Sequence, residues 1–498
     1  MQGHVRRSGV IMPVFSLPSR CGIGSLGSPA LGFAEFLHSA GQTLWQMLPL
    51  GPTGFADSPY QSFSSFAGNP YLIDLDMLAG DGLLTASELS SAERPDGYID
   101  YGDLYSTRFD LLRKACARFG GSEALRAFAA EEPDIADYAL FMALKRRFGM
   151  APWYGWPEDI RRRSSGAVER WQAELEDEIN FELFMQYEFS RQFSRLRARC
   201  RELGVFLIGD MPMYPAPDSA DVWASPGQFQ LDGELRPVSV AGVPPDYFSE
   251  TGQLWGNPLY RWDAMERGGF AWWRRRIGAA AKLYDCIRLD HFRALESYWS
   301  VPAAAETAAE GRWLPGPGKA FTDMLARDFP GTSFIAEDLG LITEPVHELR
   351  RRAGMPGMAV LSFAFESGAN SSYLPHALER MCVCCTGTHD NDTLAGLIDG
   401  MTDEQRAFTA DYCGGASPRA VIRAGMASCA DVFIAQMQDW LGLGSGARIN
   451  TPGVPGGSWR WRLGRDELSP QLAFDMLKMT QTFDRLPAGD KEEQPNEN

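Results

Sequence analysis

Short apolar segments that alternate with longer helical patterns are the feature of this sequence that most limits its fold. Strands are expected at residues 10–15, 43–50, 205–208, 283–289, 333–336, 358–365 and 382–385. Helical periodicity predicts helices at positions that include residues 31–40, 105–148, 166–203, 345–353 and 418–438. Apolar strands that alternate with helices are typical of parallel βα units. We therefore expect an α/β protein, and eight such units would close into a (β/α)8 barrel.

The chain has 498 residues, which is long enough for one barrel with insertions. We expect a single barrel domain over residues 1–498. A helical and loop insertion is expected at 54–203, after the second strand, and an aromatic-rich loop insertion at 215–262, after the third. The charged residues 490–498 are expected to form a frayed tail.

Charge and cysteine content exclude several classes of protein. The net charge of −17 repels phosphate backbones, so we expect no nucleic-acid partner. No apolar run approaches the roughly 20 residues of a membrane span, and Pro13 ends the first apolar stretch too early for a secretion signal. The nine cysteines are sparse and odd in number, which favours reduced thiols and a cytoplasmic location. The cluster Cys382, Cys384 and Cys385 is interpreted as a buried strand, because no second ligand pair stands at zinc spacing.

Four acidic residues stand where expected strands end: Asp210, Asp290, Glu337 and Asp390. The carboxyl ends of parallel barrel strands meet at one mouth, so these side chains are expected to converge. Converged carboxylates shift each other's pKa values apart, so that one is ionised while another is protonated. Cleavage of a glycosidic bond requires one ionised carboxylate and one protonated carboxyl group. A single acid at a strand end more often caps the next helix, but four together favour a site.

The residues beside these acids indicate separate roles. Arg288 and Asp290 lie two positions apart on a strand and so share one face, where the guanidinium would keep the carboxylate ionised and oriented as a nucleophile. Glu337 follows an apolar run, and burial raises the pKa of a carboxyl group, so it is the natural proton donor. His389 and Asp390 follow a buried strand and could bind sugar hydroxyls.

Aromatic residues are frequent, with 14 Trp, 15 Tyr and 29 Phe. Many of the tryptophans stand in segments rich in glycine and proline. Flat rings on loops suit stacking on a pyranose, but large proteins also bury tryptophan, and both interpretations stay open here. The residues concerned are Trp153, Trp156, Trp223, Trp255, Trp313 and Trp459.

The segments around the four acids read GDMPMY, RLDH, AEDLG and THDN, and they resemble the signature regions of the α-amylase superfamily. Longer stretches at 43–75 and 237–262, with INTPG at 449–453, are similar to the 4-α-glucanotransferase family over about Ser8 to Leu463. This resemblance implies a (β/α)8 barrel with inserted, largely helical subdomains and no separate C-terminal β-domain. Ser458 stands where the family usually has Asn, which predicts the loss of one hydrogen bond without loss of activity.

The resemblance also implies the roles of individual residues. Asp290 would form the covalent glycosyl-enzyme, Glu337 would act as acid and then as base, and Asp390 would stabilise the distorted sugar. Tyr60 would stack on the donor sugar, and Trp255 would lie on the acceptor side. No cofactor and no metal ion are expected, because carboxylates supply both the covalent and the proton steps. The residues implied to bind substrate are Tyr60, Asp210, Trp255, Asn257, Arg288, His291, Phe363 and His389.

The implied activity is that of a retaining 4-α-glucanotransferase acting on maltooligosaccharides, amylose or glycogen-derived α-1,4-glucans. The aromatic residues of 242–262 are predicted to form a lid that excludes water and so favours transfer; the other interpretation is a packed structural insertion. An α-amylase-like retaining hydrolase would use the same carboxylates. A non-catalytic glucan-binding protein should lack at least one of them. The lid residues are Tyr247, Phe248, Trp255, Tyr260 and Trp262.

Overall fold

The computed structural model describes residues 6–245, 249–454 and 456–486. Within these residues, eight strands form one parallel sheet in the order β10-β11-β12-β1-β2-β3-β6-β9. The two edge strands also meet, because the N–H of Ala336 donates to the carbonyl of Pro356 at 2.9 Å. The sheet is therefore a nearly closed barrel, which confirms the expected (β/α)8 fold. Its strands are β1 Arg7–Ile11, β2 Leu44–Gln46, β3 Phe206–Met211, β6 Cys286–Leu289, β9 Ser333–Ala336, β10 Gly357–Val360, β11 Cys382–Cys385 and β12 Val432–Gln436.

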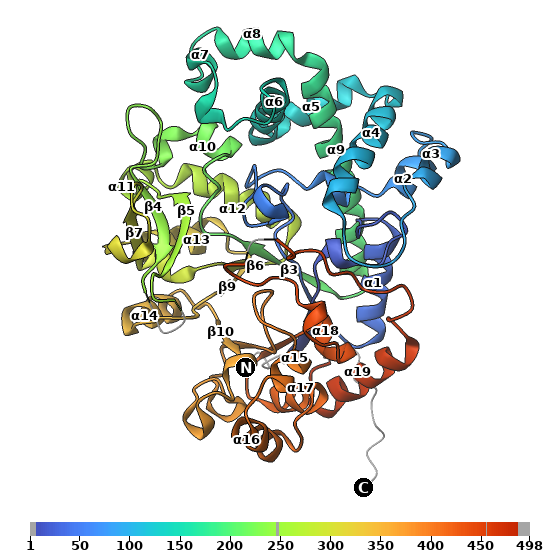
Figure 1. Ribbon diagram of the computed structural model, residues 1–498, viewed down its shortest axis with the longest axis vertical. Coiled ribbons are helices and arrows are strands. Elements are labelled where there is room, and N and C mark those ends of the chain that lie inside the picture. Colours follow the sequence, from blue (N-terminus) through green and yellow to red (C-terminus); the bar gives the residue numbers. More distant parts are fainter. Residues whose placement is uncertain (1–5, 246–248, 455, 487–498) are drawn as a thin grey trace.

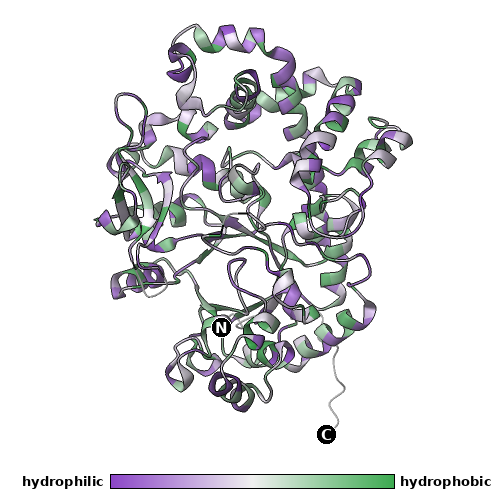
Figure 2. Ribbon diagram, viewed as in Figure 1, coloured by the Kyte–Doolittle hydropathy of each residue, from purple (hydrophilic) through white to green (hydrophobic). Residues whose placement is uncertain are grey.

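Helices surround this barrel (Figure 1). The packing of α1 on β2 shows how they attach, because the rings of Phe33 and Trp45 meet edge to face at 4.9 Å. The buried Trp45 indole N–H also donates to the carbonyl of Met12 at 2.8 Å, so no polar atom of this ring is left unpaired. Figure 2 shows hydrophilic and hydrophobic residues side by side on the peripheral helices, as expected of helices that cover a core. These helices include α1 Ser28–Ser39, α12 Ala271–Leu283, α13 Gly318–Asp328, α14 Glu344–Arg352, α15 Leu394–Asp399, α16 Asp403–Cys413 and α17 Pro418–Ala427.

The connection between β2 and β3 forms a helical region at the top and right of Figure 1. Its last and longest helix, α9, runs back to the barrel and contacts β3. The helices of this region are α2 Leu75–Gly80, α3 Ala86–Ser91, α4 Tyr101–Arg118, α5 Ser122–Glu131, α6 Pro133–Arg147, α7 Glu158–Arg161, α8 Ala167–Glu174 and α9 Glu176–Glu202.

The connection between β3 and β6 contains two strands in addition to helices, where the sequence predicted a loop-like insertion. These strands join two later ones in an antiparallel sheet of order β5-β4-β7-β8, at the left of Figure 1. Gly242 lies within β4 and Pro258 ends β5, and both residues are rare in strands, so the sequence pattern that marks a strand is weak there. The elements are β4 Ser239–Val243, β5 Gln253–Pro258, β7 Ser297–Pro302, β8 Arg312–Pro315, α10 Ala220–Ala224 and α11 Trp262–Arg267.

The expectation of one helix over 418–438 is wrong. The helix begins as predicted, with the Ser417 side chain accepting from the N–H of Ala420, but it ends at Ala427, and β12 follows as the eighth barrel strand. A short apolar run is compatible with a buried strand or a buried helix, so periodicity did not distinguish them. The first strand, expected at 10–15, lies earlier, at Arg7–Ile11; Pro13 lacks the N–H that a ladder needs, and a 3₁₀ turn follows it.

After β12 the described chain contains two α-helices, α18 Met437–Leu441 and α19 Pro470–Thr482, joined by a long connection that is mostly loop. Up to Leu486, no β-domain follows the barrel. The predicted tail at 490–498 lies outside the described residues. No helix in the described part of the chain is both long enough and apolar enough to cross a membrane.

Candidate active site

The strand register brings two of the predicted acids together at the carboxyl end of the barrel. Leu289 of β6 pairs with Ala336 of β9. The next residues, Asp290 and Glu337, therefore leave the barrel side by side on neighbouring strands. Parallel barrels place their reactive groups at this end, because all the strand ends open there into loops.

Arg288 lies between two carboxylates. Its Nη1 donates to Oδ1 of Asp210 at 2.7 Å and to Oδ1 of Asp290 at 2.9 Å. The Asp210 side chain is fully buried, whereas that of Asp290 is 27% exposed. Burial disfavours the charged guanidinium, but these carboxylates outweigh it and hold the pKa of Arg288 above its ordinary value. Arg288 therefore remains charged and fixes the Asp290 oxygen that it contacts, while Asp290 stays open to solvent.

Glu337 is held by two backbone N–H groups. That of His291 donates to Oε2 at 2.7 Å, and that of Leu339 donates to Oε1 at 2.8 Å. His291 adopts a left-handed backbone conformation with φ 48°, a strained choice for this residue that occurs where its N–H meets the carboxyl group. Burial raises the pKa of Glu337 to about 7; Arg288 opposes the rise and Asp290 adds to it. Glu337 thus still carries a proton in a large fraction of molecules near neutral pH.

A chain of polar contacts joins Asp210 to Asp390. The Tyr60 hydroxyl donates to Oδ2 of Asp210 at 2.9 Å and lies 3.1 Å from Nδ1 of His389. Nε2 of His389 lies 3.3 Å from Oδ1 of Asp390. The rings of Tyr60 and His389 are stacked at 4.6 Å, with the ring of Trp459 at 5.8 Å from each. One face of the Tyr60 ring is therefore occupied by His389.

Among the described residues of the predicted lid, Trp255 reaches this site. Its ring meets that of His291 at 4.9 Å, nearly perpendicular. Tyr260 and Trp262 are buried in the core, so for them the structure matches a packed insertion. Tyr247 and Phe248 lie outside the described residues.

Two predicted contact residues have other partners. The buried amide of Asn257 donates to the carbonyl of Pro215 at 2.9 Å, which anchors the segment after β3 rather than facing the carboxylates. Phe363, in a 3₁₀ turn after β10, packs at 5.7 Å against Tyr373. The pKa of Tyr373 is raised by its burial and by the nearby Asp338 and Glu337.

Sequence reasoning missed Asn450, Arg448 and Trp459 as site residues. The Asn450 amide donates to Oδ1 of Asp390 at 2.6 Å, and Arg448 donates to the Asp390 carbonyl. In the sequence, Asn450 is marked only by its place in the INTPG motif. Trp459 is one of several tryptophans in segments rich in glycine and proline, and nothing local to it distinguishes it from the others.

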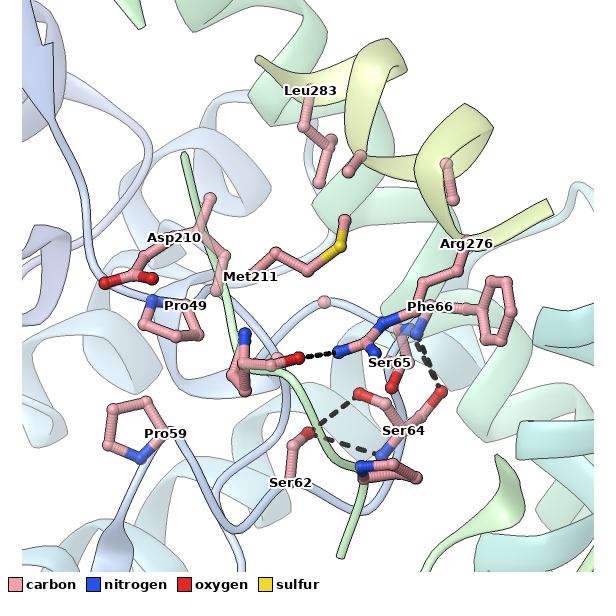
Figure 3. Close-up of a pocket in the computed structure, with 18 of the residues that line it drawn as sticks. Pro49, Pro59, Ser62, Ser64, Ser65, Phe66, Asp210, Met211, Arg276 and Leu283 are labelled. Atoms are coloured by element: carbon pink, nitrogen blue, oxygen red, sulfur yellow. Dashed lines mark hydrogen bonds between the residues drawn. The ribbon is translucent and has the colours of Figure 1, made fainter. Parts of the chain in front are cut away.

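A pocket of about 720 Å³, including its open mouth, adjoins the site (Figure 3). Figure 3 shows Asp210 at one end of this pocket and Arg276 and Ser64 at the other. Tyr60 and Asp210 line it, but Asp290, Glu337 and Asp390 do not. One wall is the ring of Tyr284, which lies against Gly209, where a Cβ would come within 2.1 Å of the ring. The pocket therefore meets the site at Asp210 and Tyr60 and is not lined by the three proposed catalytic acids.

The chemistry available here is acid, base and nucleophile chemistry of carboxylates. In the described residues no group of His, Cys, Asp and Glu is arranged to hold a metal ion. Cys382, Cys384 and Cys385 lie in the buried strand β11. An oriented carboxylate beside an arginine, next to a carboxyl group that carries a proton in a large fraction of molecules, can perform a double displacement at a sugar carbon.

Comparisons with known proteins agree with this chemistry. A family model described as 4-alpha-glucanotransferase matches residues 12–467. The 4-alpha-glucanotransferase of Thermus thermophilus is 46% identical over 97% of this chain and 99% of its own, and that of Clostridium butyricum is 41% identical over 95% and 100%. The solved amylomaltase from Streptococcus agalactiae, in complex with acarbose, is 35% identical with a TM-score of 0.94, and the match covers 97% of this chain and 100% of that one.

Proposed function

We propose that this protein, which belongs to the 4-alpha-glucanotransferase family, moves α-1,4-glucan segments between maltooligosaccharides through a covalent glycosyl-enzyme. The proposal rests on two acidic side chains that stand at neighbouring strand ends in different surroundings. Asp290 lies against Arg288, and Glu337 has a pKa of about 7. Related proteins of 41–46% identity carry the same activity in their names. All nine cysteines are unpaired, so a reducing, cytoplasmic location is part of the proposal.

In the first half of the reaction, an oxygen of Asp290 attacks the anomeric carbon and forms an ester bond. The glycosidic bond breaks, and its oxygen takes the proton of Glu337, so the shortened chain leaves as an alcohol. In the second half, Glu337 accepts the proton of an acceptor 4-hydroxyl as that oxygen attacks the same carbon. The ester bond breaks and Asp290 is regenerated. Asp390 would bind the hydroxyls of the distorted donor ring.

The choice between transfer and hydrolysis depends on which hydroxyl reaches the glycosyl-enzyme first. Trp255 extends from β5 over His291, beside the acid and the nucleophile. A flat ring at this place would bind an acceptor sugar and displace water. This favours transfer over the alternative of an α-amylase-like hydrolase.

Incubation with maltotriose tests the proposed function. We expect glucose together with a ladder of longer maltooligosaccharides, while the total number of reducing ends stays nearly constant. Chromatography of the products and a reducing-end assay measure the two quantities. Glucose and maltose alone, with reducing ends that rise with every bond cut, would instead establish the hydrolase.

The pH dependence of transfer follows from the raised pKa of Glu337. The acid must hold its proton to release the leaving chain, and it loses that proton as pH rises through about 7. We expect kcat/KM for maltotriose to fall above this pH, by about tenfold per pH unit. Initial rates from about pH 5 to about pH 9 measure it. A profile that remains flat beyond about pH 8 would contradict the assignment of Glu337 as the acid.

A further inference from the structure

We propose that Asn450 is the positioning residue of Asp390: its side-chain amide holds Oδ1, so that Oδ2 is the oxygen offered to the donor sugar. The inference rests on the proposed function, in which Asp390 binds hydroxyls of that sugar. It gives a physical role to the INTPG motif.

The segment 448–450 clamps His389 and Asp390 through their backbones. The N–H of Asn450 donates to the carbonyl of His389 at 3.1 Å. The Arg448 guanidinium donates to the carbonyl of Asp390 at 2.5 Å and to that of Asn450 at 2.7 Å. Arg448 thus ties the two segments together, although they are about 60 residues apart in the chain. These backbone contacts alone fix the relative position of the two segments, without any contribution from the Asp390 side chain.

The side-chain contact then distinguishes the two carboxylate oxygens of Asp390. Oδ1 accepts from the Asn450 amide at 2.6 Å. No residue in the described part of the chain donates to Oδ2, and the Asp390 side chain is 45% exposed. Oδ1 is therefore the anchored oxygen, and among the described residues Oδ2 has no protein donor that would compete with a sugar hydroxyl.

His389 does not replace Asn450 as the donor to Oδ1. The single proton of the Tyr60 hydroxyl goes to Asp210, so the Tyr60 oxygen accepts from Nδ1–H of His389. Nε2 of His389 lies 3.3 Å from Oδ1 of Asp390, which is farther than the 2.6 Å of the Asn450 amide. The Asn450 amide is thus the nearer donor to this oxygen, and it is a neutral one.

A neutral donor suits this role. The χ2 torsion of an aspartate, which rotates its carboxylate, has broad minima. Without a hydrogen-bond partner, the Asp390 carboxylate would therefore rotate away from the orientation that binds the distorted sugar ring. An arginine would fix the group but also neutralise it, as Arg288 partly does for Asp210. The amide orients Asp390 and leaves its negative charge for the sugar hydroxyls, whose hydrogen bonds strengthen as positive charge develops on the ring.

Two substitutions at one position test this role. Asn450→Ala removes the donor, and we expect kcat on maltotriose to fall by about 30-fold while KM changes by less than about threefold. The ratio of its kcat to that of the wild type should be the same at every pH. Asn450→Asp places a second carboxyl group against Oδ1, and two carboxyl groups so close share a proton. When that group holds the proton it donates to Oδ1 as the amide did, so activity relative to the wild type should recover by about tenfold from about pH 8 to about pH 5.

Ser458→Ala is the matched control. The Ser458 hydroxyl accepts from the N–H of Thr451 at 3.2 Å, so the same loop loses a hydrogen bond without any change at Asp390. We expect its kcat to stay within about twofold of the wild type. Equal losses in Ser458→Ala and Asn450→Ala would show general loosening of the loop and overturn the inference. So would an Asn450→Asp variant whose activity follows that of Asn450→Ala at every pH.

The same assay separates this inference from the function on which it rests. A wild-type protein that transfers glucan, beside an Asn450→Ala variant of equal kcat, would overturn the inference alone. A wild-type protein that transfers nothing would overturn the proposed function, and the inference with it.

Discussion

Replacing Glu337 with glutamine is expected to lower turnover of maltotriose by about 10³-fold while leaving the binding of maltooligosaccharides almost unchanged. The amide has nearly the volume of the carboxyl group, and its oxygen can still accept from one of the two N–H groups, those of His291 and Leu339. Its N–H protons are not acidic enough to be transferred to the leaving oxygen. Steady-state rates and calorimetric titration with a maltooligosaccharide measure the two effects separately.

Glu344→Gln is the matched control for this substitution. Glu344 lies in the same connection, at the start of α14, where it is exposed and paired with Arg351. Its loss should leave turnover within about twofold of the wild type. Undiminished transfer by Glu337→Gln would remove Glu337 from its role as the acid.

The strand ends are the part of the site that the sequence predicted well. β9 and β11 have the bounds that their apolar runs indicated, and Asp290 and Glu337 stand one residue beyond paired positions. A strand places its last side chain with little freedom, so a short apolar run followed by an acid is enough to locate it.

The sequence did not predict which loops contact one another. Asn450 meets Asp390 from a segment with no strand of its own, and nothing local to either residue encodes their distance. The aromatic residues were ambiguous for a similar reason: Trp153 and Trp223 are fully buried, whereas Trp255 meets His291 at the site. All three tryptophans stand in segments rich in glycine and proline, so local composition does not distinguish them. Only the packing of distant elements decides which ring is buried.

Asp290→Asn is expected to have the largest effect of all, a loss of transfer of at least about 10⁴-fold, because a neutral amide oxygen is too weak a nucleophile to form the ester. The asparagine oxygen can still accept from Arg288, so the surroundings of the site are preserved. Rates with maltotriose measure the loss, and the melting temperature checks that the fold is intact. Transfer at wild-type rate would remove Asp290 from the mechanism.

An α-glucosyl fluoride distinguishes this variant from Glu337→Gln, although both lose activity on maltotriose. Fluoride leaves without a proton, so the first half of the reaction needs the nucleophile but not the acid. Glu337→Gln should therefore still release fluoride in a burst and then retain one glucosyl unit on Asp290, because the base that activates the acceptor is missing. Asp290→Asn should release none. Mass spectrometry of the intact protein and of its peptides identifies the adduct, and finding it on any residue other than Asp290 would refute the assignment of the nucleophile.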